Sequence, residues 1–310
     1  MVDNKQKFDR TMKEEVYQTY QPYIKQLVNK VKEINKTIDK KIPVLFYNST
    51  ELRLYINGLA LLIHFYNDHK SKDFKITYAK AITSLIEVYK NRTAIDKFEN
   101  FLNKLPDIIN VFLNYKNNKQ KERELEGNLV AVLQNGKHPF AALDMEIVVS
   151  NSLDKNCLFD SSSNAEMDML LIAERNNELQ LIPVELKRAE ATPKTIKQAP
   201  VEIASSINLL LDEEIRKAMI KTYVNNFKKY KELGLLTLND QKITYEALCS
   251  GLIVIIDERK GKLYTIDTVD LKDEKNSKLI DKTKCPEKYN IKRLTMSSEV
   301  FLKGKWIEEI

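Results

Sequence analysis

The segment from Ala165 to Lys187 constrains the fold most strongly, because it contains two apolar runs joined by the polar string ERNNE. Such a pattern predicts two antiparallel strands closed by a short turn. Side chains alternate between the two faces of a strand, so Glu185 and Lys187 project from one face of the second strand. The pairing brings Asp168, near the start of the first strand, to the same edge. Two carboxylates and one ammonium group are therefore expected to converge.

This set of charges is typical of a site that binds a divalent cation and a phosphate. Mg²⁺ is held by one or two carboxylates while it keeps several waters, and a phosphate can take one of the open positions. A neighbouring lysine can orient or deprotonate the attacking water, or it can offset the negative charge that grows on the phosphate in the transition state. The residues thus indicate hydrolysis of a phosphodiester bond.

The same residues resemble the motifs of the PD-(D/E)xK nuclease superfamily. Glu166-Met167-Asp168 stands where the family has Pro-Asp, although no proline precedes Asp168, and Glu185-Leu186-Lys187 stands where it has Glu-x-Lys. Sixteen residues separate Asp168 from Glu185, which suits a hairpin, and the resemblance covers residues 118–268, about half of the chain. The short motifs gain weight from their context, an apolar strand with an Asp-bearing strand before it and a helix on each side.

The resemblance implies a restriction-endonuclease-like fold and a divalent-metal-dependent nuclease. Its cofactor would be Mg²⁺, with Mn²⁺ as a substitute, and its partner would be nucleic acid, with DNA as the expected substrate. Asp168 and Glu185 would bind the metal, and Lys187 would act on the attacking water. Restriction or defence against foreign DNA is the setting that the family suggests.

Two flanking helices supply further candidates through the same resemblance. The string KERELEGNLVAVLQNG predicts a helix before the first strand, where the family carries a metal-binding glutamate. Glu126 and Glu122 both fit, and the spacing to Gly136 favours Glu126. The helix expected after Pro193 carries Gln198, which corresponds to a polar residue that faces the metal site in several branches of the family. For either glutamate the alternative is a solvent-facing helix carboxylate.

Composition adds little about function but restricts the class of protein. The net charge of +6 is compatible with a polyanionic partner, yet the excess of lysine over arginine weakens that signal. The N-terminal string MVDNKQKFDR is polar, and the longest apolar run, residues 54–66, is too short to span a bilayer, so we expect a cytoplasmic protein without membrane association. Three widely spaced cysteines predict neither a disulfide framework nor a zinc site: Cys157, Cys249 and Cys285.

Residues 1–117 are predicted to form an all-helical module. Apolar residues recur at three- and four-residue steps in four segments, with a cap for the second one at Asn48-Ser49-Thr50-Glu51. The expected helices cover residues 16–38, 52–69, 78–90 and 94–115. We expect that this module mediates any homodimer or partner contact.

Residues 118–310 are predicted to form a nuclease-like α/β domain with a mixed sheet of four or five strands. The expected order is helix, three strands, helix, strand. Beyond the hairpin, strands are expected over residues 142–150, 251–257 and 262–269, a basic helix over residues 217–234, and a strand-like end over residues 300–310.

Two other classes of protein stay open. The first is a non-catalytic protein that binds nucleic acid or another protein and uses a nuclease-like scaffold, since a fold does not determine a function. The second is a different metal or nucleotide enzyme. Against the second, the sequence lacks a glycine-rich phosphate loop and a histidine-rich ligand set.

Overall fold

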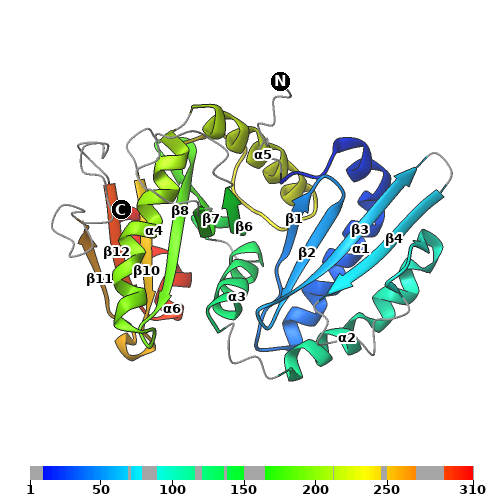
Figure 1. Cartoon of the computed structure of the whole chain (residues 1–310), viewed down its shortest axis with the longest axis horizontal. Coiled ribbons are helices and arrows are strands. Elements are labelled where there is room, and N and C mark those ends of the chain that lie inside the picture. The colour runs from blue at the N-terminus through cyan, green and yellow to red at the C-terminus, as the bar shows by residue number, and fades with distance from the viewer. Residues whose placement is uncertain are drawn as a thin grey trace. The chain divides into compact units, whose positions relative to one another are not determined.

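The structure of the chain is a computed structural model that divides into two compact units (Figure 1). The N-terminal unit comprises Asp9–Gly136 and Asn225–Leu236, and the C-terminal unit comprises mainly Lys137–Val224 and Thr237–Ile310. The structure describes residues 10–68, 71–78, 89–115, 121–135, 138–149, 165–211, 213–245, 250–269 and 290–309. Each unit contains its own sheet, and each is described by itself.

A five-stranded antiparallel sheet forms the centre of the N-terminal unit, in the order β1-β2-β3-β4-β5. The strands are β1 (Val44–Asn48), β2 (Glu51–Ile56), β3 (Leu59–Asp68), β4 (Ser71–Tyr78) and β5 (Thr93–Ala94). The helices are α1 (Glu14–Thr37), the 3-10 turn η3 (Ile95–Lys97), α2 (Phe98–Asn114) and α3 (Lys121–Asn135).

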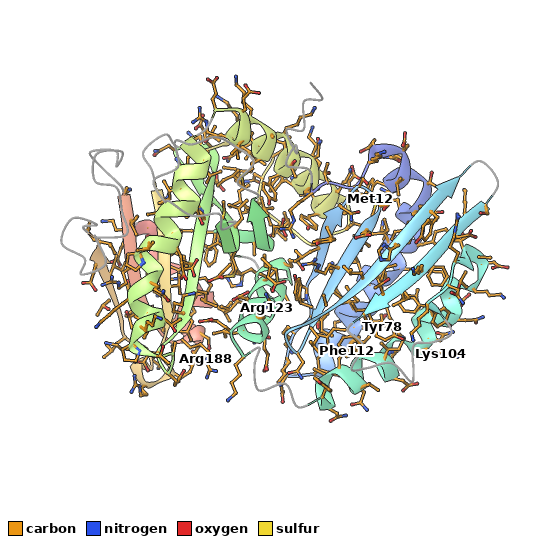
Figure 2. The ribbon with its side chains drawn as sticks, viewed as in Figure 1. Met12, Tyr78, Lys104, Phe112, Arg123 and Arg188 are labelled. Atoms are coloured by element: carbon orange, nitrogen blue, oxygen red, sulfur yellow. The ribbon has the colours of Figure 1, made fainter. Side chains whose placement is uncertain are left out.

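Aromatic side chains fill the core between this sheet and the helices α1 and α2. The ring of Phe98 on α2 lies 5.0 Å from that of Phe74 on β4 and 5.7 Å from that of Tyr23 on α1, in both cases edge-on. Phe112, labelled in Figure 2, is fully buried in the same unit. Burial of each such ring stabilises the folded state by about 1.5–3 kcal/mol. This core holds α1 and α2 on the sheet.

The prediction of an all-helical module over residues 1–117 is wrong, since strands occupy much of it. The segment 52–69 is the hairpin β2–β3, in which Leu54 pairs with Leu61. Its turn consists of Asn57 and Gly58, which adopt φ angles of 53° and 75°. An Asn-Gly pair accepts these left-handed angles easily and is a strong hairpin signal. The strands beside it are so apolar that periodicity alone cannot distinguish them from a buried helix.

The other helix predictions in this part of the chain have mixed outcomes. Helices over residues 16–38 and 94–115 are confirmed by α1 and by η3 with α2. The expected cap at Asn48-Ser49-Thr50-Glu51 is instead the turn between β1 and β2, where the backbone N–H of Thr50 donates to Oδ1 of Asn48. The expected helix over residues 78–90 falls mainly on residues outside the described ranges.

A seven-stranded mixed sheet forms the centre of the C-terminal unit, in the order β11-β12-β10-β8-β7-β6, with β9 paired to β8. The strands are β6 (Phe140–Val149), β7 (Ala165–Arg175), β8 (Glu178–Arg188), β9 (Ile243–Thr244), β10 (Ser250–Ile256), β11 (Tyr264–Thr268) and β12 (Asn290–Met296). The helical elements are α4 (Pro193–Leu211), α5 (Glu213–Glu232), η4 (Glu258–Lys260), α6 (Ser298–Lys303) and η6 (Lys305–Glu309), and α5 continues into the N-terminal unit.

Strand β8 lies inside this sheet, antiparallel to β7 and parallel to β10, which in turn is parallel to β12. Helix α4 crosses one face of β8 and β10 (Figure 1). Its apolar side, which includes Ala199, Ile203 and Ile207, packs against the β10 residues Ile253 and Ile255. A strand covered in this way needs apolar side chains on most positions. The polar residues of β8 therefore stand out.

The predicted hairpin of the opening segment is confirmed. Strands β7 and β8 pair in antiparallel register from Met169 opposite Val184 to Arg175 opposite Glu178. The turn residues Asn176 and Asn177 have φ angles of 50° and 63°. Asparagine tolerates this region better than most residues, so the sequence suits a tight two-residue turn.

The mixed α/β class is confirmed, but several details of the sheet differ from the prediction. The sheet has seven strands rather than four or five. Strand β12 was not predicted; it lies between β10 and β11, so the returning strand β11 pairs with β12 and not with β10. The expected strand over residues 300–310 is wrong, because α6 and η6 occupy it and bury Phe301 and Trp306. The three cysteines lie outside the described residues.

None of the helices in the described ranges combines the length and the apolar character needed to cross a membrane.

Candidate active site

Asp168 and Glu185 lie on neighbouring strands of the C-terminal unit. The register places Met169 opposite Val184. Asp168, the residue before Met169 on β7, therefore lies across from Glu185, the residue after Val184 on β8. Oδ2 of Asp168 accepts a hydrogen bond of 2.7 Å from the backbone N–H of Leu186. This bond fixes the carboxylate of Asp168 at the edge where Glu185 projects.

The ammonium group of Lys187 lies among three carboxylates. It donates a short hydrogen bond to Oε1 of Glu185, and its Nζ is 3.8 Å from Oδ2 of Asp168. The third neighbour is Glu202 of α4, whose Oε2 lies 3.3 Å from Nζ. The chain thus gathers acidic groups from β7, β8 and α4 around one cation.

The alternation of β8 explains why its charged residues share a face. Val184 and Leu186 point to the apolar side and are fully buried, whereas Glu185 and Lys187 point to the other side. These two charged residues are only 3% and 6% exposed, because β8 is an inner strand. Charged side chains are almost never buried to this degree unless they are paired.

The buried surroundings shift the pKa of both β8 residues. Burial raises the pKa of Glu185 well above its usual range, and the charge of Asp168 raises it further, while Lys187 acts in the opposite direction. Burial alone would lower the pKa of Lys187, but the charges of Glu185 and Asp168 outweigh it and raise the pKa above its usual value. Lys187 therefore stays positively charged at neutral pH.

Glu202 was not predicted from the sequence, whereas Gln198 on the same helix was. The two residues are four positions apart, so they lie on one helical face. Glu202 forms an ion pair with Lys187. Gln198 is half-buried, and in the described part of the chain it forms no hydrogen bond or ion pair with Lys187 or Glu185. Glu202 directly precedes Ile203, which is buried in the apolar face of α4. This position at the border of the apolar face is the sequence feature that could have identified Glu202.

The two helix glutamates expected near the metal lie on α3 in the N-terminal unit. Glu126 is buried there, with 2% of its surface exposed, and Glu122 is half-buried. The residues that the C-terminal unit itself brings together are Asp168, Glu185, Lys187 and Glu202.

The donor chemistry of this cluster fits a hard divalent cation. Every acidic ligand is a carboxylate oxygen, and Oε2 of Glu185 is a buried acceptor that receives no hydrogen bond within the described residues. In the present conformation the cation among the carboxylates is the Lys187 ammonium, and no described group of three or more His, Cys, Asp or Glu side chains is arranged to hold a metal ion. A divalent ion would have to compete with Lys187 for Glu185.

The chain was compared with protein-family models, with curated proteins and with solved structures. No family model, curated protein or solved structure matches it. The resemblance to PD-(D/E)xK nucleases therefore remains a prediction that rests on the residues of the hairpin and on their geometry.

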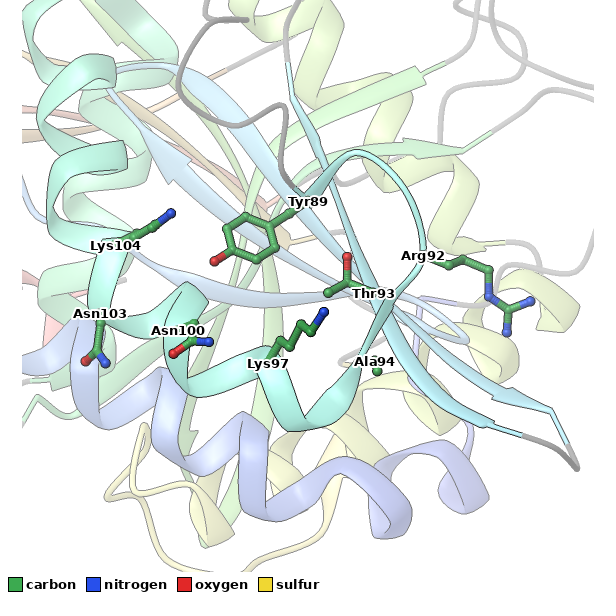
Figure 3. Close-up of a pocket in the computed structure, with 8 residues that line it drawn as sticks. All are labelled: Tyr89, Arg92, Thr93, Ala94, Lys97, Asn100, Asn103 and Lys104. Atoms are coloured by element: carbon green, nitrogen blue, oxygen red, sulfur yellow. The ribbon is translucent and has the colours of Figure 1, made fainter.

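A second feature with binding potential is a cavity of about 600 Å³ in the N-terminal unit (Figure 3). Two of its three cations, Lys97 and Lys104, are exposed side chains of η3 and α2. The third, Arg92, points away from them in Figure 3; it pairs with Asp73 at 3.4 Å and lies over the ring of Tyr66. Asn100, Asn103, Tyr89, Thr93 and Ala94 complete the lining. This cavity lacks the buried charge that distinguishes the β7–β8 site.

Proposed function

We propose that the protein is a divalent-metal-dependent nuclease that hydrolyses phosphodiester bonds, with DNA as its substrate. The observation that carries the proposal is the buried cluster of Asp168, Glu185 and Lys187 at the end of one hairpin. Burying such charges costs free energy that an apolar core would not incur, so the cluster is better explained by chemistry than by stability.

The order of elements along the chain supports a restriction-endonuclease-like fold. After α3 come the strands β6, β7 and β8, then the helices α4 and α5, and then β10 after the short strand β9. The predicted order of helix, three strands, helix and strand is contained in this series. The site residues lie on the second and third of the three strands, where the resemblance requires them.

In this proposal Asp168 and Glu185 would hold Mg²⁺, or Mn²⁺ in its place. The resemblance alone assigns Glu126 of α3, with Glu122 as the alternative, to support of the ion. When bound, the ion supplies Lewis-acid polarisation of a phosphate oxygen. Gln198 is placed near the site by the resemblance alone.

Lys187 has a more limited set of roles than its sequence motif suggests. Because its pKa is raised, it carries a proton at neutral pH and is a poor general base. A charged ammonium group can orient the attacking water by donating an N–H hydrogen bond to its oxygen, and it can offset the charge that develops on the phosphate. We therefore assign Lys187 an electrostatic and positioning role.

The biological setting follows from the resemblance alone. A nuclease of this class in the cytoplasm would serve in restriction or in defence against foreign DNA. Cleavage of both strands would require two active sites, which a homodimer would supply.

The test is a cleavage assay with the full chain on supercoiled plasmid, single-stranded DNA and RNA, with Mg²⁺, Mn²⁺ or EDTA. Wild-type protein should cleave DNA only when a metal is present. Lys187→Ala and Asp168→Asn should each reduce the rate at least about 100-fold, since each removes a group that acts on the transition state. Lys217→Ala is the matched control, because Lys217 is an exposed residue of α5 paired with Glu213.

Circular dichroism should show that the two site variants remain folded. Retention of full activity in both of them would overturn the assignment. Binding of DNA without cleavage under any condition would instead support the non-catalytic alternative.

A further inference from the structure

One wall of the cavity in the N-terminal unit is formed by η3 and the helix α2 (Figure 3). Lys97 at the end of η3 is followed by Asn100 and Lys104 at steps of three and four residues, so these side chains share one side of the helical segment. All three are exposed, whereas Phe101 on another face of α2 is fully buried in the core. A packed helix therefore holds the polar wall of the cavity in place.

The lining of this cavity is positively charged. The described residues that line it include no Asp or Glu side chain. Arg92 pairs with Asp73, but neither Lys97 nor Lys104 forms an ion pair in the described part of the chain. The two ammonium groups therefore give the cavity a potential that attracts anions.

Tyr89 adds the hydroxyl group of a buried side chain to the same cavity. The residue is only 4% exposed, and its ring lies 5.7 Å from that of Phe74 and 5.5 Å from that of Phe101. Figure 3 shows its hydroxyl group directed toward α2, and within the described residues this group forms no hydrogen bond. Burial raises the pKa of Tyr89, so the hydroxyl keeps the proton that it can donate to a ligand.

The polar groups of the cavity are suited to a phosphate monoester. The two ammonium groups, the amides of Asn100 and Asn103 and the hydroxyl of Tyr89 can all donate hydrogen bonds. A phosphate monoester carries about two negative charges at neutral pH and has three strong acceptor oxygens. The lysines can balance that charge, and the other donors can satisfy the oxygens.

Two observations favour a small molecule over a strand of nucleic acid. The cavity volume of about 600 Å³ lies in the range of pockets that hold one small ligand. Sites for single-stranded nucleic acid stack bases on accessible aromatic rings. Tyr89 is the aromatic residue among the described lining residues, and its buried ring presents no face to a base.

We propose that this cavity binds the phosphate group of a small phosphate monoester, a molecule of about the size of a nucleotide. Lys97 and Lys104 hold the phosphate by their charge, and Asn100, Asn103 and Tyr89 donate hydrogen bonds to its oxygens. The site lies within the N-terminal unit and does not depend on the nuclease assignment of the β7–β8 site.

The test is isothermal titration calorimetry of the full chain with AMP, adenosine and inorganic phosphate in the presence of EDTA. The chelator prevents binding of phosphate through a metal ion at the β7–β8 site. AMP and inorganic phosphate should bind, and adenosine should not. Lys97→Gln and Lys104→Gln should each weaken AMP binding at least about tenfold, because each removes a charge-assisted hydrogen bond. Tyr89→Phe keeps the packed ring and should weaken binding about threefold, through loss of one neutral hydrogen bond.

Lys25→Gln is the matched control, because Lys25 is an exposed lysine of α1 in the same unit and does not line the cavity. It should bind AMP as the wild type does. Equal affinity of the wild type, Lys97→Gln and Lys104→Gln for AMP would overturn the proposal, and so would failure of both AMP and inorganic phosphate to bind at millimolar concentration. A single-stranded DNA oligonucleotide without a terminal phosphate provides the last arm. If it binds more tightly than AMP and both lysine variants lose it, the cavity belongs to a nucleic acid surface and the small-molecule ligand is refuted.

Discussion

The protein contains two hairpins of similar construction and very different content. Strands β2 and β3 join through Asn57 and Gly58, and β7 and β8 join through Asn176 and Asn177; all four turn residues have positive φ angles. The inward face of the first hairpin is apolar throughout, with Leu52, Leu54, Ile56, Leu61, Ile63 and Phe65 fully buried. The second hairpin is apolar in its middle, where Leu171 and Ile172 pair with Ile182 and Leu181, but it buries charged side chains at the end far from its turn.

The comparison shows that hairpin formation did not require the charges. The β2–β3 hairpin buries hydrocarbon alone, which is favourable in proportion to its area. The β7–β8 hairpin buries Glu185 and Lys187, whose removal from water is costly even when they pair. Because the chain forms the β2–β3 hairpin without buried charge, buried charges are not needed to form a hairpin. The difference therefore points to chemistry at the end of β8.

The largest expected effect comes from breaking the buried charge cluster. Lys187→Met removes the ammonium group that pairs with Asp168, Glu185 and Glu202 in the described part of the chain, so three carboxylates remain together. We expect a loss of about 3 kcal/mol in the free energy of unfolding, measured by urea denaturation without metal. The double variant Lys187→Met with Glu185→Leu should recover that loss or exceed the wild type, because both buried charges are then replaced by apolar groups.

The control for this experiment lies on the other hairpin. Leu54→Met exchanges one buried apolar residue of β2 for another of similar volume, and it should cost less than about 1.5 kcal/mol. If Lys187→Met lowered the free energy of unfolding no more than Leu54→Met does, burial of the charge cluster would carry no energetic cost. The two hairpins would then not differ in energy in this way.

The same comparison explains which parts of the fold could be predicted from the sequence. The β7–β8 hairpin is bounded by a polar turn, ERNNE, and the prediction holds. The β2–β3 hairpin has only Asn57-Gly58 between two runs that are apolar at nearly every position, and a helical interpretation of residues 52–69 failed there. Where both faces of an element are largely apolar, turn chemistry carries more information than periodicity.

Long-range pairing limited the rest of the prediction. Strand β12 follows residues 270–289 in the chain yet inserts between β10 and β11, and no local pattern specifies such an order. Glu202 reaches Lys187 only because α4 packs across β8, which is again a tertiary relation. By contrast, Asp168, Glu185 and Lys187 meet through one hairpin, so strand alternation was enough to bring them together.

Substitutions in the two hairpin turns should have an intermediate effect on the stability of the protein. Gly58 and Asn177 occupy the second turn position of their hairpins, with φ angles of 75° and 63°. Gly58→Ala places a side chain in the left-handed region and should destabilise the protein by about 1 kcal/mol. Asn177→Gly relieves the same restriction and should stabilise it by a few tenths of a kcal/mol, up to about 1. Thermal melting of both variants measures the two changes, which should have opposite signs. Changes of the same sign would show that the two turns are not equivalent.

The smallest expected effect concerns an ion pair beside the same sheet as the buried cluster, between the buried carboxylate of Asp257 and the exposed guanidinium group of Arg259. Asp257 follows β10, and its two carboxylate oxygens accept hydrogen bonds of 2.7 and 2.9 Å from the guanidinium group of Arg259, which is 79% exposed. These hydrogen bonds lower the pKa of Asp257. A carboxyl group whose pKa is lower in the folded state stabilises the protein above its unfolded pKa, and this contribution is lost as the pH falls through the folded pKa.

Asp257→Asn tests this pair because the amide oxygen can still accept the backbone N–H of Arg259 while the charge is removed. At pH 7 the melting temperature should fall by no more than about two degrees, since the Arg259 partner is exposed and solvent screens its charge. The difference from the wild type should shrink as the pH is lowered through the acid range below the ordinary pKa of an aspartate, where the wild-type carboxylate also becomes neutral. Asp267→Asn, on the exposed side of β11, should show neither change. If Asp257→Asn destabilised the protein at pH 7 as much as Lys187→Met does, this comparison would be contradicted. An ion pair with an exposed partner would then contribute as much to stability as the pair buried inside the sheet.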